Sequence, residues 1–174
     1  HTPLVIAVDM SSAMAASDLP PSRLLQVRAK LATLLRERAG GQVALVAYAG
    51  EAFTVAPLTD DAENVALFLD ALEPDVMPVD GQQADKAIAS AVRLMQQAGF
   101  DHGDILLLTD HADAAANLAA AEARRLGFRV STLGVGTAAG APYRSADGAI
   151  SQARLDAGSL RAVSASGGGS YQLL

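Results

Sequence analysis

Two acidic residues, each at the end of an apolar run, are the first candidates for chemistry in this sequence. The run 4–8 leads into Asp9, and the run 105–108 leads through Thr109 into Asp110. Short apolar runs bounded by polar residues predict buried strands, most simply those of a parallel sheet. The carboxyl ends of parallel strands meet at one edge of a sheet, where open α/β sheets bind their ligands. We therefore expect the two acids to share one polar site.

The residues that follow Asp9 indicate a divalent cation as one ligand of that site. Ser11 and Ser12 come within three positions of the acid, and carboxylate and hydroxyl oxygens are hard donors that suit Mg²⁺ or Mn²⁺. Asp110 would supply a second anchor. A structural alternative stays open, because Asp and Ser after a strand often cap a helix or hydrogen-bond loop amides.

Catalytic roles for the same residues are the second set of alternatives. Asp9 could accept a phosphoryl group, which would make the chain a phosphate-binding or phosphoryl-transfer α/β domain. That chemistry usually needs further acids and a lysine in the adjacent loops, and no lysine lies near a predicted strand end. Ser11 and Ser12 lack the G-x-S-x-G setting of a hydrolase nucleophile. His111 could serve as a base beside Asp110, but a lone loop histidine more often faces solvent.

Strand and helix patterns alternate along nearly the whole chain and would position these loops. Period-two or continuous apolar runs predict the strands, and apolar residues at helical spacing predict the helices. The expected strands are 4–9, 42–49, 52–56, 104–110, 129–135 and 170–174, and the expected helices are 22–38, 60–72, 83–98, 114–126 and 155–164.

This alternation predicts a Rossmann-like, doubly wound α/β fold with a mostly parallel sheet and helices on both faces. The turn at Gly50 is too short for a parallel crossover, so the strand after it should form an antiparallel edge. Asp60 is the expected cap of the second helix, with Glu63 completing a capping box. The segment 134–151 is weakly patterned, and we expect an excursion with a hairpin at Asp147-Gly148.

Composition limits the classes of function. The chain has 174 residues, of which 51% are hydrophobic, and carries a net charge of −6, which fits one domain and argues against nucleic acid. It has no cysteine, so disulfides and thiolate metal sites are excluded, and no apolar run reaches the roughly 18 residues of a membrane span. Since the sequence enters a strand almost at once from His1, we expect residues 1–174 to be a single domain cut from a longer protein.

Taken together, these motifs resemble the von Willebrand factor A domain over essentially the whole chain. The carrying features are the D-x-S motif at Asp9, the strand pair within 43–55, the loop before the third helix and the strand that ends in Thr109-Asp110. Within that family, four segments are similar to the bacterial Bat proteins of the aerotolerance operon, BatB-like in the last of them. These segments are 21–24, 46–53, 56–61 and 132–142.

The resemblance implies a non-enzymatic protein–protein interaction module. In that family a divalent cation binds at the metal-ion-dependent adhesion site, and an acidic side chain of the partner completes its coordination. The resemblance also implies a bacterial inner-membrane protein, anchored by helices outside this domain, with the domain on the periplasmic side. The expected partner is a protein, such as another Bat-family or periplasmic protein.

The adhesion motif is incomplete in this sequence. Asp9, Ser11 and Asp110 match its ligand positions, but Ala13 replaces its second serine and Gln82 its loop threonine. An alanine donates no oxygen, and Mg²⁺ demands near-ideal coordination geometry. We therefore expect Mg²⁺ or Mn²⁺ to bind weakly or not at all at this degenerate site.

A degenerate site predicts a largely metal-free interface with the partner. We expect it to lie on the loops 9–21, 51–61, 78–83 and 110–113. The side chains expected to meet the partner there are Met10, Ser12, Met14, Met77, Gln82 and His111.

Overall fold

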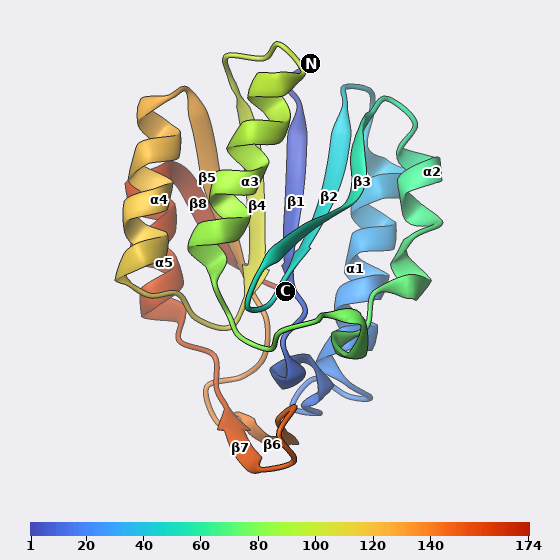
Figure 1. Ribbon diagram of the computed structural model, residues 1–174, viewed down its shortest axis with the longest axis vertical. Helices are drawn as coiled ribbons and strands as arrows, with labels where there is room; N and C mark the ends of the chain where they lie inside the picture. The colour runs from blue at the N-terminus through green and yellow to red at the C-terminus, as the bar shows by residue number, and fades with distance from the viewer.

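One central sheet places the two acidic strand ends side by side. The computed structural model describes residues 1–174, and its main sheet has six strands in the order β3-β2-β1-β4-β5-β8 (Figure 1). All neighbours are parallel except β2 and β3, as the short turn at Gly50 predicts. The strands are β1 (Leu4–Asp9), β2 (Val43–Tyr48), β3 (Ala52–Thr59), β4 (Gly103–Thr109), β5 (Phe128–Gly134) and β8 (Gly168–Leu173).

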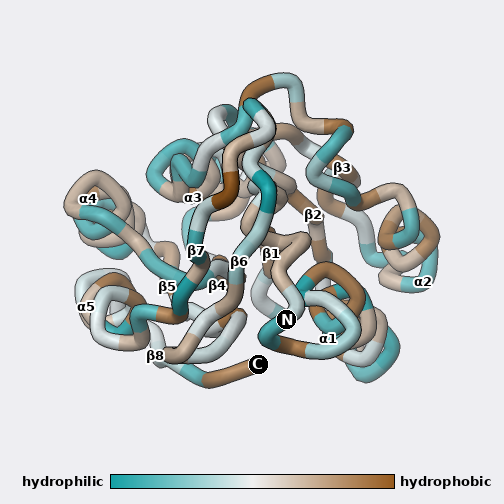
Figure 2. Tube along the Cα trace, turned by 90° about the horizontal axis from the view of Figure 1, so that it is seen from below, coloured by the Kyte–Doolittle hydropathy of each residue, from teal (hydrophilic) through white to brown (hydrophobic).

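Helices cover both faces of this sheet, which confirms the predicted doubly wound class. Figure 2 looks onto the carboxyl edge, the edge where the parallel strands end, and shows α3, α4 and α5 on one side of the sheet with α1 and α2 on the other. The helices are α1 (Arg23–Glu37), α2 (Ala62–Ala66), α3 (Ala84–Gln97), α4 (Ala114–Arg125) and α5 (Ala157–Gly167). Short 3-10 turns lie at Ser12–Ala15, Leu69–Ala71 and Pro74–Val76.

Two apolar layers join the helices to the sheet. On the α1 face, Val27, Leu31 and Leu35 are buried against Ile6, Val8 and the other residues of that core. On the opposite face, Ile88 and Met95 of α3 pack over strand residues that point the other way. Each such side chain, when fully buried, contributes about 1.5–3 kcal/mol to the free energy of unfolding, so the strand ends sit on a rigid support.

A separate two-stranded hairpin lies across the carboxyl edge. It consists of β6 (Ala141–Arg144) and β7 (Ile150–Ala153), which pair antiparallel, and it projects below the sheet in Figure 1. Its base packs on the first loop, where Ala141 and Ala153 contact Ala13 and Ala16. The excursion predicted at 134–151 is therefore an ordered cover over one part of that edge.

The region after β3 differs from the sequence prediction in two respects. Asp61, not Asp60, caps α2, because its carboxylate accepts the hydrogen bond from the Asn64 amide at 3.1 Å. The helix ends at Ala66 and continues only as a 3-10 turn. This change of pitch turns Phe68 away from the buried stripe, and its side chain is 40% exposed.

Candidate functional site

The site is built where β1 and β4 end beside each other. The register pairs Val8 with Leu108, so Asp9 lies level with Thr109 and Asp110 follows one residue further out. Gln82, from the loop that leads into α3, lies between them. Its Nε2 donates to Asp9 Oδ2 at 2.6 Å and to Asp110 Oδ1 at 3.0 Å. The predicted meeting of the two acids at one edge is therefore what the structure shows.

Asp9 is surrounded by neutral donors. Its Oδ1 accepts the Ser11 amide at 2.8 Å, and its Oδ2 accepts the Thr109 hydroxyl at 2.8 Å in addition to the Gln82 amide. The side chain is buried. Burial raises the pKa of Asp9 above its usual range, and the hydrogen bonds from Gln82 and Ser11 only partly oppose that shift. No lysine or arginine pairs with it.

Asp110 lies beside an arginine and a histidine. Arg23 Nη1 donates to its Oδ2 at 2.8 Å, and His111 Nδ1 lies 2.7 Å from its Oδ1. Burial alone would raise the pKa of Asp110, but the contacts with His111 and Arg23 outweigh it and the pKa is lowered. The same contact raises the pKa of His111, whose side chain is about half exposed.

Arg23 is the centre of a buried ion cluster. It is the first residue of α1, only 1% exposed, and its Nε and Nη2 donate to the two oxygens of Asp18 at 2.7 and 2.9 Å. The pKa of Asp18 falls to about 2 because of that pairing. Gly136 faces the guanidinium with a φ of +107°, and a Cβ there would collide with it. A charge this deeply buried is stable only when paired in this way.

The residues present do not fit a divalent cation. All four carboxylate oxygens of Asp9 and Asp110 already accept hydrogen bonds from the chain itself, and the Gln82 amide nitrogen bridges the two acids. Ala13 offers a methyl group, and no group of three acidic, histidine or cysteine side chains in the chain is arranged to hold a metal ion. The Ser11 hydroxyl is the one potential ligand left, buried and without a well-formed hydrogen bond.

A further carboxylate, that of Asp80, lies at the rim of the site. Its Oδ1 accepts the amides of Ser12 and Gly81 at 3.1 and 2.9 Å, and its Oδ2 accepts the Ser12 hydroxyl and the Ala146 amide of the hairpin. Burial would raise the pKa of Asp80, but these hydrogen bonds lower it. Asp80 thereby ties the first loop, the 74–81 loop and the hairpin together.

The structure brings most of the predicted site residues together, but two of them, Met10 and Met14, lie in the core and not at the site. Asp9, Ser11, Gln82 and Asp110 form the centre, with Ser12 and His111 at its rim. The prediction that Met10 and Met14 are exposed is wrong. Both are 1% exposed, because the loop after β1 folds into a 3-10 turn that returns them to the core under α1.

The predicted interface loop 51–61 is only partly at the site. Residues 52–59 are a strand that runs away from the carboxyl edge, since Thr59 pairs with Val43 at the start of β2. Only Glu51 and its immediate neighbours stay near the site, where Lys86 pairs with Glu51 at 2.7 Å. Asp60 and Asp61 lie at the opposite edge of the sheet.

Three charged residues of the site were not predicted, namely Arg23, Asp18 and Asp80. A signal existed for Arg23, because it continues the buried stripe of Val27 and Leu31 by one step of four residues. A charge on the apolar face of a helix indicates a buried ion pair. No comparable local signal marks Asp18 or Asp80.

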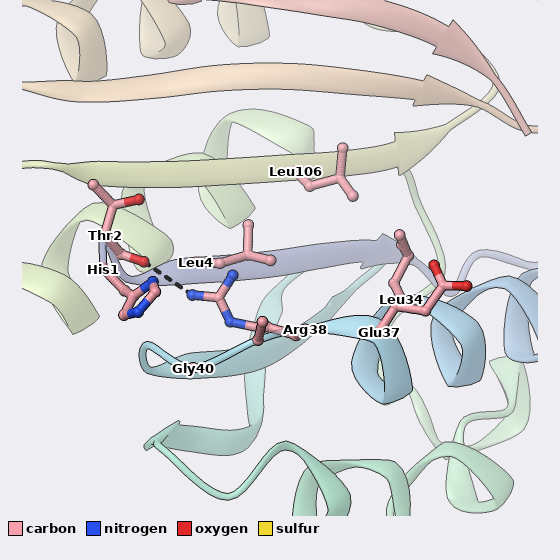
Figure 3. A pocket seen from close by; sticks show the side chains of 9 residues that line it. His1, Thr2, Leu4, Leu34, Glu37, Arg38, Gly40 and Leu106 are labelled. Atoms are coloured by element: carbon pink, nitrogen blue, oxygen red, sulfur yellow. Dashed lines mark hydrogen bonds between the residues drawn. The ribbon is translucent and has the colours of Figure 1, made fainter.

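A hollow of about 400 Å³ also opens near the opposite, amino edge of the sheet. Figure 3 shows it between the end of α1, β1 and β4, with Leu4, Leu34 and Leu106 on its walls. Arg38 Nη2 donates to the Thr2 carbonyl at 2.9 Å there. Its polar groups do not converge on a common point as those of the carboxyl edge do.

Comparison with known proteins assigns the family. The family model described as the von Willebrand factor type A domain matches residues 4–113, so the chain belongs to that family. More particularly, it is similar to BatB from Bacteroides thetaiotaomicron, a protein of unassigned function. The two share 31% identity and a TM-score of 0.91, over 100% of this chain and 90% of that one.

Two further solved structures agree with this assignment. An aerotolerance-related membrane protein from Bacteroides fragilis is 28% identical with a TM-score of 0.90, over 100% of this chain and 92% of that one. A von Willebrand factor type A protein from Catenulispora acidiphila is 19% identical with a TM-score of 0.71, over 100% of this chain and 38% of that one, and shows the fold alone. A comparison with curated proteins finds no match. None of the helices here is both long and apolar enough to cross a membrane.

Proposed function

We propose that this domain is a protein–protein interaction module that binds its partner at the carboxyl edge without a metal ion. Membership of the von Willebrand factor A family supports the interaction role. The single observation that carries metal independence is the saturation of Asp9 and Asp110. Every carboxylate oxygen that a cation would use already accepts a donor from Gln82, Arg23 or a neighbour.

The cellular setting is proposed by similarity. One of the similar structures is described as an aerotolerance-related membrane protein. We propose that the domain works in a membrane-associated Bat-type complex linked to stress or aerotolerance, on the periplasmic side of the inner membrane. Its partner would be another Bat-family or periplasmic protein.

We also propose that the domain is not an enzyme. The alternative role of Asp9 in phosphoryl transfer needs a carboxylate oxygen that can reach phosphorus. Asp9 is 1% exposed, and both its oxygens are engaged. Incubation with a phosphate ester such as p-nitrophenyl phosphate should give neither turnover nor a covalent acyl-phosphate, and either product would contradict the proposal.

Thermal unfolding with and without divalent cations tests the metal-free site. We expect the same melting temperature in EDTA and in millimolar Mg²⁺ or Mn²⁺. A bound ion at a hundred times its Kd would stabilise the fold by about 2.7 kcal/mol, and a domain of this size gains roughly 2–4 °C per kcal/mol. A rise of several degrees that Asp110→Asn abolishes would overturn the proposal.

A gain-of-binding variant supplies the positive control. Ala13→Ser with Gln82→Thr adds two hydroxyl groups, one at each lost ligand position, and removes the bridging amide. We expect this double variant, but not the parent, to melt several degrees higher in Mg²⁺ than in EDTA. If it gains nothing, Gln82 is not what keeps the ion out.

A further inference from the structure

The rim of the site contains a small polar cavity that the fold itself does not use. We call it the rim cavity. It has a volume of about 240 Å³ and is lined by Ser11, Ser12, Asp80, Gly81, Gln82 and Tyr143. Protein sites for small molecules usually measure about 300–1,000 Å³. The rim cavity is therefore of a size for one side chain of a partner.

The unpaired polar groups of the rim cavity accept hydrogen bonds. Both amide hydrogens of Gln82 point to the inner carboxylates, which leaves its Oε1 without a protein donor. The Ser11 hydroxyl is buried, with the residue 3% exposed, and it has no hydrogen-bond partner of good geometry. A buried polar group of this kind costs about 1–3 kcal/mol unless a ligand or water satisfies it.

The charge of the cavity is negative and lacks a counter-ion. Asp80 accepts only neutral donors, from Ser12, Gly81 and Ala146, and no lysine, arginine or histidine lies within ion-pair distance of it. Its lowered pKa keeps it ionised at neutral pH.

The groove next to the rim cavity also carries uncompensated negative charge. It measures about 480 Å³, shares Ser12 and Asp80 with the rim cavity, and adds the exposed, unpaired Asp75. Its single cation, Arg144, donates to the Gly148 carbonyl of its own hairpin at 2.7 Å and makes no ion pair. The entrance to the cavity thus carries more negative than positive charge.

We propose that the rim cavity takes a lysine or arginine side chain of the partner protein, attracted by the uncompensated negative charge of Asp80 and hydrogen-bonded by the free acceptors of Ser11 and Gln82. A lysine side chain has three hydrogen-bond donors and an arginine side chain five, and neither has an acceptor. Such side chains complement a cavity whose free groups are acceptors. Tyr143 on the wall offers an aromatic ring that favours a cation. This inference rests on the proposed function and reverses the acidic ligand that the family resemblance implies.

Titration with model peptides, followed by ¹⁵N–¹H NMR of the domain in EDTA, tests the proposal. The probes are capped Gly-Arg-Gly, Gly-Lys-Gly and Gly-Glu-Gly. We expect the arginine and lysine peptides to shift the backbone amides of Ser12, Gly81 and Gln82, and the glutamate peptide to leave them unchanged. Higher salt should weaken both shifts, because the pairing is electrostatic.

Two matched variants locate the effect. Asp80→Asn keeps the shape of the side chain but removes its charge, and we expect it to weaken peptide binding about tenfold. Asp60→Asn removes an exposed charge at the opposite edge of the sheet, and binding should not change. The dispersion of the same spectra shows that both variants are folded.

The remaining outcomes each decide one question. Shifts at these amides with the glutamate peptide, or equal binding by Asp80→Asn, would overturn the proposed polarity while leaving the interaction module intact. No shift with any peptide would overturn the cavity as a side-chain site. Failure of the proposed function shows separately, as Mg²⁺-dependent melting of the parent domain.

Discussion

Asp9 and Asp110 end neighbouring strands and share one amide, yet their surroundings differ in kind. Around Asp9 the donors are an amide, a hydroxyl and the Gln82 side chain, all neutral, and its pKa rises. Beside Asp110 stand Arg23 and His111, and its pKa falls. The two carboxylates lie in one site, but only Asp110 has a permanently positive neighbour, Arg23.

The difference shows how two buried acids can share one site in a stable fold. Two buried carboxylates that share one amide donor repel each other unless other groups compensate their charges. Gln82 supplies dipoles to both, and Arg23 supplies a full charge to one. The remaining acid, Asp9, has no partner ion, and burial raises its pKa instead.

Arg23→Met should cause the largest loss of stability, because it removes the one permanent charge that distinguishes Asp110 from Asp9. The variant leaves Asp18 and Asp110 buried without their shared counter-charge, so the free energy of unfolding should fall by about 3–5 kcal/mol. Urea unfolding at neutral pH measures the loss. Arg125→Met removes an arginine from an exposed ion pair with Glu122 and should cause no measurable change. An unaltered midpoint for Arg23→Met would mean that the carboxylates have another source of compensation.

Lowering the pH should reduce the free energy of unfolding by a smaller amount. Asp18 has a folded pKa of about 2 against an ordinary value of 3.8, so it stabilises the fold above pH 4 by roughly 2 kcal/mol, and this contribution is lost as pH falls through about 2. Asp110 acts with the same sign. The raised pKa of Asp9 acts with the opposite sign, because its contribution is present at low pH and is lost as pH rises through the folded value.

Urea unfolding at pH 7, 4 and 2.5 checks these signs. Asp18→Asn should flatten the loss of stability below pH 4, whereas Asp9→Asn should not flatten it. If the two variants give parallel curves, the two acids do not differ as described.

The smallest expected effects lie around Asp9 and have opposite signs. Thr109→Val keeps the side-chain shape but removes the hydroxyl that donates to Asp9, and should cost about 1 kcal/mol. Ser11→Ala removes a buried hydroxyl that has no protein partner, so stability should stay level or rise by up to about 1 kcal/mol. Equal losses in both would show that the Ser11 hydroxyl is already satisfied.

The sequence predicted the fold well because its signals are local. Apolar runs mark the buried strands β1, β2, β4 and β5, and caps and glycines mark the helix ends, as at Ser22 and Gly99. The meeting of Asp9 with Asp110 followed from parallel strand order alone. The prediction that Phe68 is buried was wrong because α2 ends at Ala66 and a 3-10 turn follows. No periodicity in the sequence indicates that change.

The charged part of the site depends on contacts between distant segments. Arg23 is 87 positions from Asp110, and Asp80 is 68 positions from Ser12, so neither pairing can be inferred from neighbours in the chain. Met10 was misplaced for a related reason. A loop of alternating polar and apolar residues has no period that fixes which side chains turn inward.

The guanidinium beside Asp110 has one more consequence. Because this positive charge is covalently part of α1, it is present in every folded copy, has no dissociation constant and cannot be withdrawn by a chelator. With the metal-free function proposed above, a change in the supply of free divalent ions would not switch the site. The charge that Arg23 places next to Asp110 is inherited with the polypeptide and is the same in every folded copy.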